Sequence, residues 1–257
     1  MSVALITGAS KGIGKAIAEQ LAKEKTNVLL VARSENLLQQ QVTYLSSTYQ
    51  IQADYLAIDL ATEGASQKIV DWCLGKKYSI NILVNNAGYG LSGAFEKYSL
   101  QENRDMMQVN MNVPMELCNL LIPYLSQQPK AYILNIASSA AYQAIPGMSI
   151  YAATKSFLLS FSRGLRYELR NSSISVTAVC PGATDTNFPD RAKVGEKARK
   201  AAAKVNMTPE EVSRIAMKAM FDKKAEVVAG AVSKASAFMA WLLPKRWVEK
   251  IAAGIYE

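Results

Sequence analysis

Short apolar runs bounded by turn residues alternate with longer amphipathic segments from the start of the chain to about Gly230. This alternation is typical of βαβ units, in which helices cover both faces of a parallel sheet. Strands are predicted near residues 2–7, 27–32, 54–58, 80–84, 131–137, 174–180 and 225–229, with helices between them. The pattern therefore predicts an α/β fold with a doubly wound sheet of about seven parallel strands.

Two helical segments stand out by their length, from Glu102 to Leu125 and from Ile150 to Arg170. Both carry apolar residues on more than one face, so each is expected to pack on the sheet and on a partner. No Pro/Gly/Ser-rich linker and no internal repeat interrupts the alternation, so residues 1–257 are predicted to form one domain. Residues 184–206 are long, polar and basic and are predicted to be a substrate loop or lid, and residues 231–257 a C-terminal helical extension.

Composition removes several classes of protein. Half of the residues are hydrophobic, which excludes a disordered chain. Cys73, Cys118 and Cys180 lie far apart and form no Cys-x-x-Cys pair, which argues against a disulfide framework and against a zinc site. A reduced, cytoplasmic chain without a metal is expected. Since the sequence holds no histidine, acid/base chemistry must use Tyr, Lys, Asp or Glu.

The sequence predicts neither a cleavable signal peptide nor a membrane-spanning segment. The first strand begins at Ser2 and leaves no room for a cleavable signal peptide. No apolar stretch approaches the roughly 18 to 20 residues that a membrane span needs. A membrane partner is therefore not the favoured expectation.

The formal net charge of +8 could attract nucleic acid, a membrane surface or an anionic small molecule. Much of the excess lies in one run without interleaved aromatic residues, which holds Arg191, Lys193, Lys197, Arg199, Lys200 and Lys204. A solvated helix face near a mobile loop is the favoured interpretation, and an anion-attracting rim at the mouth of an active site is the second. No nucleic-acid partner is predicted.

The first strand runs directly into a glycine-rich turn, Gly8-Ala-Ser-Lys-Gly12-Ile-Gly14, that opens a helical pattern. Glycine is needed there because a Cβ would block the tight turn or hold a pyrophosphate away from the backbone amides at the helix N-terminus. A lone glycine triplet is a weak signal, but this one follows a strand, opens a helix and lies at the start of the chain. It predicts a Rossmann-type fold that binds a dinucleotide.

The spacing Gly-x-x-x-Gly-x-Gly resembles that of the short-chain dehydrogenase/reductase family, and the resemblance extends over nearly the whole chain. Asp59, after the third strand, looks like the family's adenine-contacting residue. Asn85-Asn86-Ala87-Gly88 is similar to its Asn-Asn-Ala-Gly element, and Pro181-Gly182-x-x-x-Thr186 to its nicotinamide-side turn. Each element lies at the carboxyl end of a strand, where open α/β sheets bind ligands. Family members often have an aliphatic residue in place of Thr184, and Thr fits there sterically.

The choice of cofactor follows from charge. A NAD enzyme usually places a carboxylate at the end of the second strand, about 20 residues beyond the glycine turn, to bind the ribose 2′-hydroxyl. This chain has Ala32 there, followed by Arg33, and a guanidinium can hold a 2′-phosphate by two hydrogen bonds. Lys11, inside the glycine turn, supplies a second cation where NADP-using relatives commonly have one. NADP(H) is therefore the predicted cofactor.

Tyr151 and Lys155 are four residues apart at the start of a long helical pattern, so their side chains share one face. A free tyrosine has a pKa of about 10, and a nearby ammonium together with a nicotinamide's positive charge would favour the phenolate and lower that pKa. Tyr151 could then protonate a carbonyl oxygen as hydride arrives at the carbon, or take the proton in the reverse direction. By the family pattern, Lys155 also binds the nicotinamide ribose.

The resemblance adds two further residues to the chemistry. Ser138 lies thirteen residues before Tyr151, at the offset of the family's substrate-orienting serine, and would hydrogen-bond the substrate oxygen. Ser139 ranks second, because alternation along a strand should turn it to the other face. Asn110 matches the family's helix asparagine, which holds a water that links Lys155 to solvent, although by itself it would be taken as a helix kink or cap.

Together these arguments give the residues expected to bind the cofactor, which are Gly8, Ser10, Lys11, Gly12, Ile13, Gly14, Arg33, Asp59, Leu60, Asn86, Ala87, Gly88, Tyr151, Lys155, Pro181, Gly182, Thr184 and Thr186. The expected function is reversible hydride transfer between NADP(H) and a carbonyl or alcohol carbon, with a moderately hydrophobic ketone or aldehyde, 3-oxoacyl-like or steroid-like, as the small-molecule substrate. The two long helices resemble those by which family members pair, so a homodimer or homotetramer is expected.

Two other functions stay open on the sequence. A catalytically silent nucleotide sensor would keep the glycine turn while losing Tyr151, Lys155 or Ser138, and none of these is lost. A peripheral membrane protein could use the aromatic and leucine residues around Leu243-Pro-Lys-Arg246 as an interfacial anchor. The same segment could cover an apolar pocket or contact another subunit. Its Leu-Pro-basic element resembles the end of one bacterial branch of the family.

Overall fold

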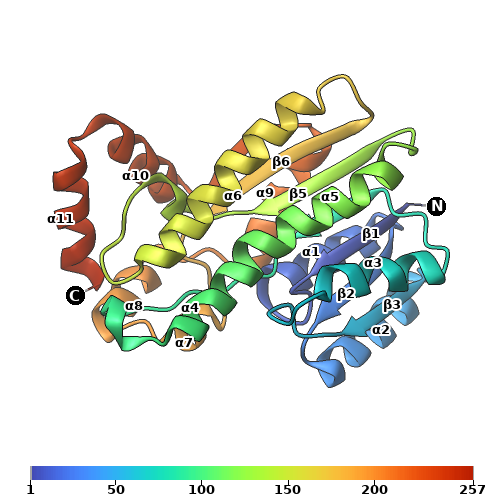
Figure 1. Ribbon diagram of the computed structural model, residues 1–257, viewed down its shortest axis with the longest axis horizontal. Helices are drawn as coiled ribbons and strands as arrows, with labels where there is room; N and C mark the ends of the chain where they lie inside the picture. The colour runs from blue at the N-terminus through green and yellow to red at the C-terminus, as the bar shows by residue number, and fades with distance from the viewer. Residues whose placement is uncertain (1, 257) are drawn as a thin grey trace.

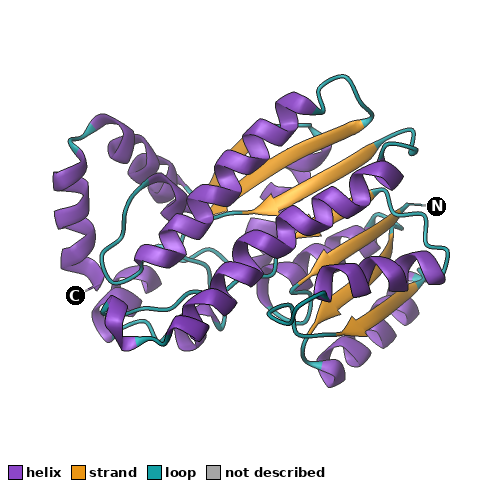
Figure 2. Ribbon diagram, viewed as in Figure 1, coloured by secondary structure: helices purple, strands orange, loops and turns teal. Residues whose placement is uncertain are grey.

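The computed structural model describes residues 2–256 and confirms the predicted α/β fold. One sheet of seven strands has the order β3-β2-β1-β4-β5-β6-β7, and each neighbouring pair is parallel (Figures 1 and 2). The strands are β1 (Val3–Thr7), β2 (Asn27–Ala32), β3 (Ala53–Ala57), β4 (Ile82–Asn85), β5 (Ala131–Ile136), β6 (Ile174–Pro181) and β7 (Glu226–Ala229). The strand order reverses its direction between β1 and β4, which is where doubly wound sheets bind their ligands.

Both faces of the sheet are covered because successive side chains of a strand point to opposite faces. In β1, Val3 and Leu5 belong to one buried cluster, and Ala4 and Ile6 belong to another. The first cluster includes side chains of α3 (Ala65–Gly75), α5 (Val113–Leu125) and α6 (Ser149–Glu168). The second includes α1 (Gly12–Lys23), α2 (Glu35–Tyr49) and α9 (Pro209–Phe221). The continuous apolar runs of the sequence are therefore strands buried on both faces.

The predicted helix from Glu102 to Leu125 is continuous in direction but contains a widened turn. It consists of α4 (Leu100–Met107), a π-helical turn over Gln108–Asn112, and α5. Pro114 has no N–H, so it cannot donate the α-helical hydrogen bond to the carbonyl of Asn110. The helix therefore forms a wider, π-helical turn before this proline, and such turns are frequent at functional sites. The long helical segment predicted from the sequence is confirmed, and the widened turn within it was not predicted.

The remaining elements lie beyond the carboxyl edge of the sheet. They are two 3₁₀ turns, η1 (Phe95–Lys97) and η3 (Ser139–Tyr142), and the helices α7 (Phe188–Arg191), α8 (Glu196–Ala203), α10 (Ala231–Leu242) and α11 (Lys245–Tyr256). The segment with α7 and α8 begins and ends at one point, because Met207 N–H donates to the Ala183 carbonyl at 3.1 Å and Asp185 N–H to the Met207 carbonyl at 2.9 Å. In Figure 1, α10 and α11 stand at the left end, outside the layers that cover the sheet.

Candidate active site

A cavity of about 900 Å³ lies at the carboxyl ends of the strands. Its wall includes most of the residues predicted to bind a cofactor or to act on a substrate. Those are Gly8, Ser10, Lys11, Gly12, Ile13, Arg33, Asp59, Leu60, Asn86, Ala87, Gly88, Ser138, Tyr151, Lys155, Pro181, Gly182, Thr184 and Thr186. Gly14 and Asn110 are the two predicted site residues that do not line the cavity, and each lies behind its wall.

The glycine turn is packed so tightly that a side chain would not fit at Gly8 or at Gly14. Gly8 has a φ of +66°, and a Cβ there would lie 2.8 Å from the Cα of Ala87. Gly14 supports the turn from behind, because a Cβ on it would lie 2.5 Å from the Gly8 carbonyl oxygen. Asn86 fastens the turn to β4 by donating from Nδ2 to the carbonyls of Thr7 at 2.9 Å and Gly8 at 3.2 Å. The turn is therefore held open toward the cavity.

The helix that follows this turn presents an open N-terminus. The N-cap residue of α1, Lys11, makes no side-chain cap, and the first turn of the helix contains no acidic residue. Unsatisfied N–H groups and the positive end of the helix dipole therefore face the cavity rim without a competing carboxylate of that helix. Such an N-terminus fits the pyrophosphate of a dinucleotide.

Cations gather at the end of the cavity near β2. Arg33 Nη1 lies 3.7 Å from Asp59 Oδ2, and both side chains are about half exposed. Arg191, from α7, places its guanidinium carbon 4.0 Å from the ring centroid of Tyr89. Burial lowers the pKa of Arg191, and the positive charge of Arg33 lowers it further, so the two arginines lie within each other's field. The two positive charges repel each other, and a multiply charged anion bound between them would relieve this repulsion.

Tyr151 is buried on α6 and faces the cavity beside Phe188, with the two ring centroids 5.2 Å apart. Ser138 follows β5, and its Oγ accepts a hydrogen bond from Ala140 N–H at 3.1 Å, which orients the hydroxyl. The expectation that Ser139 would turn to the other face was wrong. The strand ends at Ile136 and Ser139 begins η3, so strand alternation no longer applies and both serines line the cavity.

Lys155 lies deep in the protein, with only 4% of its surface exposed. Its Nζ lies 5.9 Å from the ring centroid of Tyr151 and donates to the Ile136 carbonyl at 2.9 Å. Burial lowers its pKa from 10.5 to about 8, because removal from water disfavours the charged form. Gly88 leaves room for it, since a Cβ there would lie 3.2 Å from Nζ. Tyr151 and Lys155 thus share one face of α6, as their four-residue spacing predicted.

Asn110 is fully buried in the π-helical turn and joins the loop after β4 to α6. Its Nδ2 donates to the Tyr89 carbonyl at 2.9 Å and to Thr154 Oγ1 at 3.0 Å, and its Oδ1 accepts from Tyr89 N–H at 3.1 Å. Thr154 stands beside Lys155 on α6. The side chain of Asn110 therefore positions the cavity wall around Lys155. Its backbone carbonyl receives no α-helical hydrogen bond, because residue 114 is a proline.

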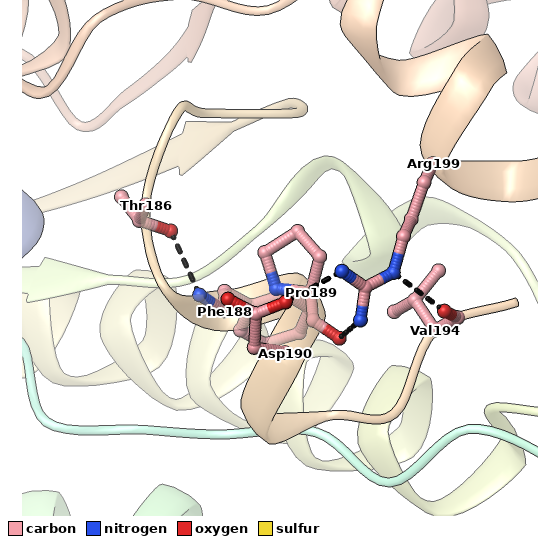
Figure 3. A network of polar contacts seen from close by, with 6 residues as sticks. All are labelled: Thr186, Phe188, Pro189, Asp190, Val194 and Arg199. Atoms are coloured by element: carbon pink, nitrogen blue, oxygen red, sulfur yellow. Dashed lines mark hydrogen bonds and ion pairs between the residues drawn. The ribbon is translucent and has the colours of Figure 1, made fainter. Parts of the chain in front are cut away.

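Residues of segment 184–206 line the cavity. Arg199 joins parts of this segment by hydrogen bonds and an ion pair (Figure 3). The Arg199 guanidinium donates to the carbonyls of Val194 at 2.7 Å and Pro189 at 2.8 Å, and contacts Asp190 at 2.5 Å. At the start of α7, Phe188 N–H donates to Thr186 Oγ1 at 3.1 Å. These bonds bring Phe188 against Tyr151 and Arg191 against Tyr89.

Several lining residues were not predicted from the sequence as site residues. All of them are apolar, and they are Ile145, Met148, Phe188, Val194, Ala198, Ala202, Val205, Val232, Ala252 and Ile255. Four of them, Ile145, Met148, Phe188 and Ala252, pack in one cluster with Tyr151. Apart from Ile145 and Met148, which shortly precede Tyr151, their sequence signal was their position in the predicted lid and C-terminal extension. The basic run also divides, because Arg191 and Arg199 belong to the site while Lys197, Lys200 and Lys204 are exposed and do not line the cavity.

Comparison with known proteins agrees with this geometry. The model of the short chain dehydrogenase family matches residues 2–197. The ketoacyl reductase HetN of Nostoc sp. is 31% identical over 226 residues, which are 87% of this chain and 77% of that protein. A short-chain dehydrogenase from Sphingobium yanoikuyae in complex with NADPH is 30% identical, with a TM-score of 0.81 and 94% of each chain covered. A bulky-bulky ketone specific alcohol dehydrogenase from Comamonas testosteroni is also 30% identical, with a TM-score of 0.78 and 94% and 92% coverage.

The chain therefore belongs to the short-chain dehydrogenase/reductase family, whose members are oxidoreductases that use nicotinamide cofactors. This confirms the resemblance found in the sequence. None of the helices in residues 2–256 combines the length and apolar character that crossing a membrane requires.

Proposed function

We propose that the protein is an NADP(H)-dependent carbonyl reductase that acts on a bulky, moderately hydrophobic ketone or aldehyde. The observation that carries the proposal is the placement of Ser138, Tyr151 and buried Lys155 on the wall of the cavity that also holds the glycine turn. The nicotinamide supplies the hydride when it is bound. The physiological direction is reduction, because NADPH is normally the reduced pool.

Each polar residue near Tyr151 has a distinct part in the reaction. Ser138 Oγ hydrogen-bonds the substrate oxygen and stabilises the negative charge that develops there. The phenol of Tyr151 donates a proton to the same oxygen, and the positive charge of Lys155 favours the phenolate that remains. Asn110 is a positioning residue, because its side chain bonds Thr154 beside Lys155 and the Tyr89 carbonyl. In keeping with the family resemblance, we propose that it also holds a water that links Lys155 to solvent.

NADP(H) is favoured over NAD(H) by the cations at the β2 end of the cavity. Ala32 stands where a carboxylate would bind a ribose 2′-hydroxyl, and Arg33 and Lys11 line the cavity beside it. Arg191 adds a third positive charge from the lid, which the sequence offered only as a rim residue. A 2′-phosphate would take the place between Arg33 and Arg191 and relieve their mutual repulsion.

The apolar end of the cavity supports a bulky substrate. A volume of about 900 Å³ holds a dinucleotide and leaves apolar space beside Tyr151, lined by Met148, Phe188 and Ala252. The name of the Comamonas testosteroni relative describes activity on bulky-bulky ketones, which agrees with this shape. We also propose, as the sequence predicted, that segment 184–206 acts as a lid, that the chain forms a homodimer or homotetramer, and that it works in the cytoplasm.

The test is a panel of ketones and aldehydes of increasing bulk, with NADPH or NADH, followed by loss of absorbance of the reduced cofactor. NADPH should be oxidised with at least one bulky ketone. Tyr151→Phe should lower kcat/KM by about 10²- to 10⁴-fold, because it removes the proton donor. Full activity of Tyr151→Phe, or no turnover across the panel while NADPH still binds, contradicts the proposal, and the second result would favour the nucleotide sensor.

A further inference from the structure

The two C-terminal helices present large apolar side chains to solvent. Trp241 is 75% exposed, and the other members of this C-terminal apolar surface are between 43% and 61% exposed. They are Phe238, Met239 and Leu242 on α10, and Trp247 and Ile251 on α11. The helices meet at Pro244, so Trp241, Leu242 and Trp247 flank the bend between them.

This surface is not needed for the protein's own core. The inward sides of the same helices are formed by other residues, since Ala240, Val248 and Ala252 are buried while Trp247 and Ile251 lie on the outer side of α11. α10 packs against η3 and β7, and α11 packs against α8. The exposed tryptophans do not line the cavity either, so the expectation that they could cover a substrate pocket is not met.

The helices that carry this surface also contribute to the rim of the cavity. Val232 and Ile255 line the cavity and are at the same time 56% and 39% exposed, so they form part of its rim. Both belong to the two helices that carry the C-terminal apolar surface. A molecule that lay against these helices would therefore be close to the rim of the cavity.

Charge distinguishes between the possible partners. Between residues 231 and 256 the basic residues are Lys234, Lys245, Arg246 and Lys250, all exposed, and the one acidic residue is Glu249. None of these cations forms an ion pair among the residues that the structure describes. A second copy placed on this surface would bring the same excess of positive charge, and like charges would repel. An anionic bilayer offers negative headgroups above hydrocarbon, an environment that matches both Lys/Arg and the amphipathic indole of Trp.

We propose that α10 and α11 bind the surface of an anionic lipid bilayer and turn the rim of the cavity toward it. Trp241, Leu242 and Trp247 enter the interfacial region, and the surrounding cations contact lipid phosphates. An apolar ketone dissolved in the bilayer then reaches the cavity beside Val232 and Ile255. The surface stands independently of the reaction, whereas the delivery of substrate rests on the proposed reductase function.

The binding test is flotation of the full-length protein with vesicles of phosphatidylcholine alone and of phosphatidylcholine with an equal part of phosphatidylglycerol. The wild type should float with the mixed vesicles, and high salt should weaken its binding. The double variant Trp241→Ser/Trp247→Ser should bind about ten-fold or more weakly, because two interfacial side chains are lost. Lys234→Gln/Lys250→Gln should also weaken binding to the mixed vesicles.

Matched controls separate this surface from general stickiness and general charge. Phe95→Ser/Leu100→Ser removes two apolar side chains that are 64% and 65% exposed elsewhere, and Lys68→Gln/Lys130→Gln removes two exposed charges elsewhere. Both control variants should float like the wild type. Unchanged flotation of the double tryptophan variant, or no flotation of the wild type, overturns the proposal.

Further measurements distinguish a lipid surface from other partners of α10 and α11, and separate membrane binding from the reductase reaction. Loss of oligomers in Trp241→Ser/Trp247→Ser during sedimentation, without vesicle binding by the wild type, would show a subunit interface and overturn the proposal. Binding of an acidic protein without vesicle binding would do the same. All four variants should reduce a water-soluble ketone like the wild type, whereas a ketone dissolved in the mixed vesicles should react about ten-fold more slowly with the double tryptophan variant. A wild type that floats but oxidises no NADPH would overturn the reductase and keep the surface.

Discussion

Lys155 is a fully buried lysine whose charge is useful to Tyr151 and costly to the fold. Burial lowers its pKa to about 8 in the folded protein from 10.5, and the bond to the Ile136 carbonyl compensates for part of the lost hydration. Between these two pH values the folded chain binds fewer protons than the unfolded chain, so stability rises with pH there. Below pH 8 the full cost of burying the ammonium is present.

Lys155→Met should therefore stabilise the protein at pH 7, by up to about 3 kcal/mol, and this advantage should shrink as the pH rises from 8 toward 10.5. Urea unfolding of both proteins across this range measures the difference. Lys11→Met, which changes an exposed lysine, should show no such trend. The prediction is wrong if the difference between wild type and Lys155→Met does not depend on pH.

Arg191 belongs to segment 184–206 and lies at the end of the cavity that we propose binds the cofactor. Arg191→Gln should raise the KM for NADPH by about ten-fold and leave that for NADH nearly unchanged, because it removes one charged contact to a 2′-phosphate. The matched control is Lys193→Gln, which makes the same charge change two residues away, where Nζ lies 5.7 Å from the ring centroid of Tyr98. Equal losses with both cofactors would place Arg191 on a phosphate that NADH shares.

A second measurement tests the residues at the end of β2. Ala32→Asp combined with Arg33→Gln should shift the preference toward NADH, because the new carboxylate repels a 2′-phosphate and can accept from a 2′-hydroxyl. Steady-state kinetics with both cofactors gives the ratio of the two kcat/KM values. Retained preference for NADPH would assign the phosphate to Lys11 and Arg191 alone.

Among the elements, α7 and α8 are joined to each other by the side chain of Arg199. Arg199→Met removes the contacts to Val194, Pro189 and Asp190, and it should raise the KM for a bulky ketone several-fold with little change in Tm, because lids belong to the least stable parts of a protein. Limited proteolysis should then cut segment 184–206 sooner. Lys200→Met, which removes only an exposed pair with Glu196 on the same helix, should behave like the wild type.

At the scale of the whole molecule, α5 and α6 lie side by side on one face of the sheet, and α4 continues the line of α5 beyond it (Figure 1). Apolar side chains of α4 and α5 are exposed. Met107, Met115 and Tyr124 are each close to 40% exposed there. If subunits pair through this face, Met115→Asp should shift a dimer or tetramer toward smaller species, because a charge would be buried without a partner. Sedimentation velocity measures this shift. Met239→Asp, on the C-terminal apolar surface, should leave the oligomer intact.

Much of the fold could be predicted because the information is local. The strands are continuous apolar runs that only a sheet buried on both faces can accommodate, and their predicted ends differ from the observed ones by at most two residues. The glycine turn and the spacing of Tyr151 and Lys155 are also local, since they depend on backbone conformations and on the period of a helix. Ser139 was misplaced because the end of β5 cannot be located from alternation alone.

What the sequence by itself determined is the order of the elements, the identity of the dinucleotide turn and the residues of the Tyr-Lys-Ser set. Only the tertiary structure decided that Arg191 lies with Arg33, that Asn110 joins Tyr89 to Thr154, and that α10 and α11 line the cavity with one side and face solvent with the other. The physical reason is that the residues in these contacts lie far apart along the chain. Periodicity fixes which side of a helix is apolar, whereas contacts between remote segments depend on how every layer packs.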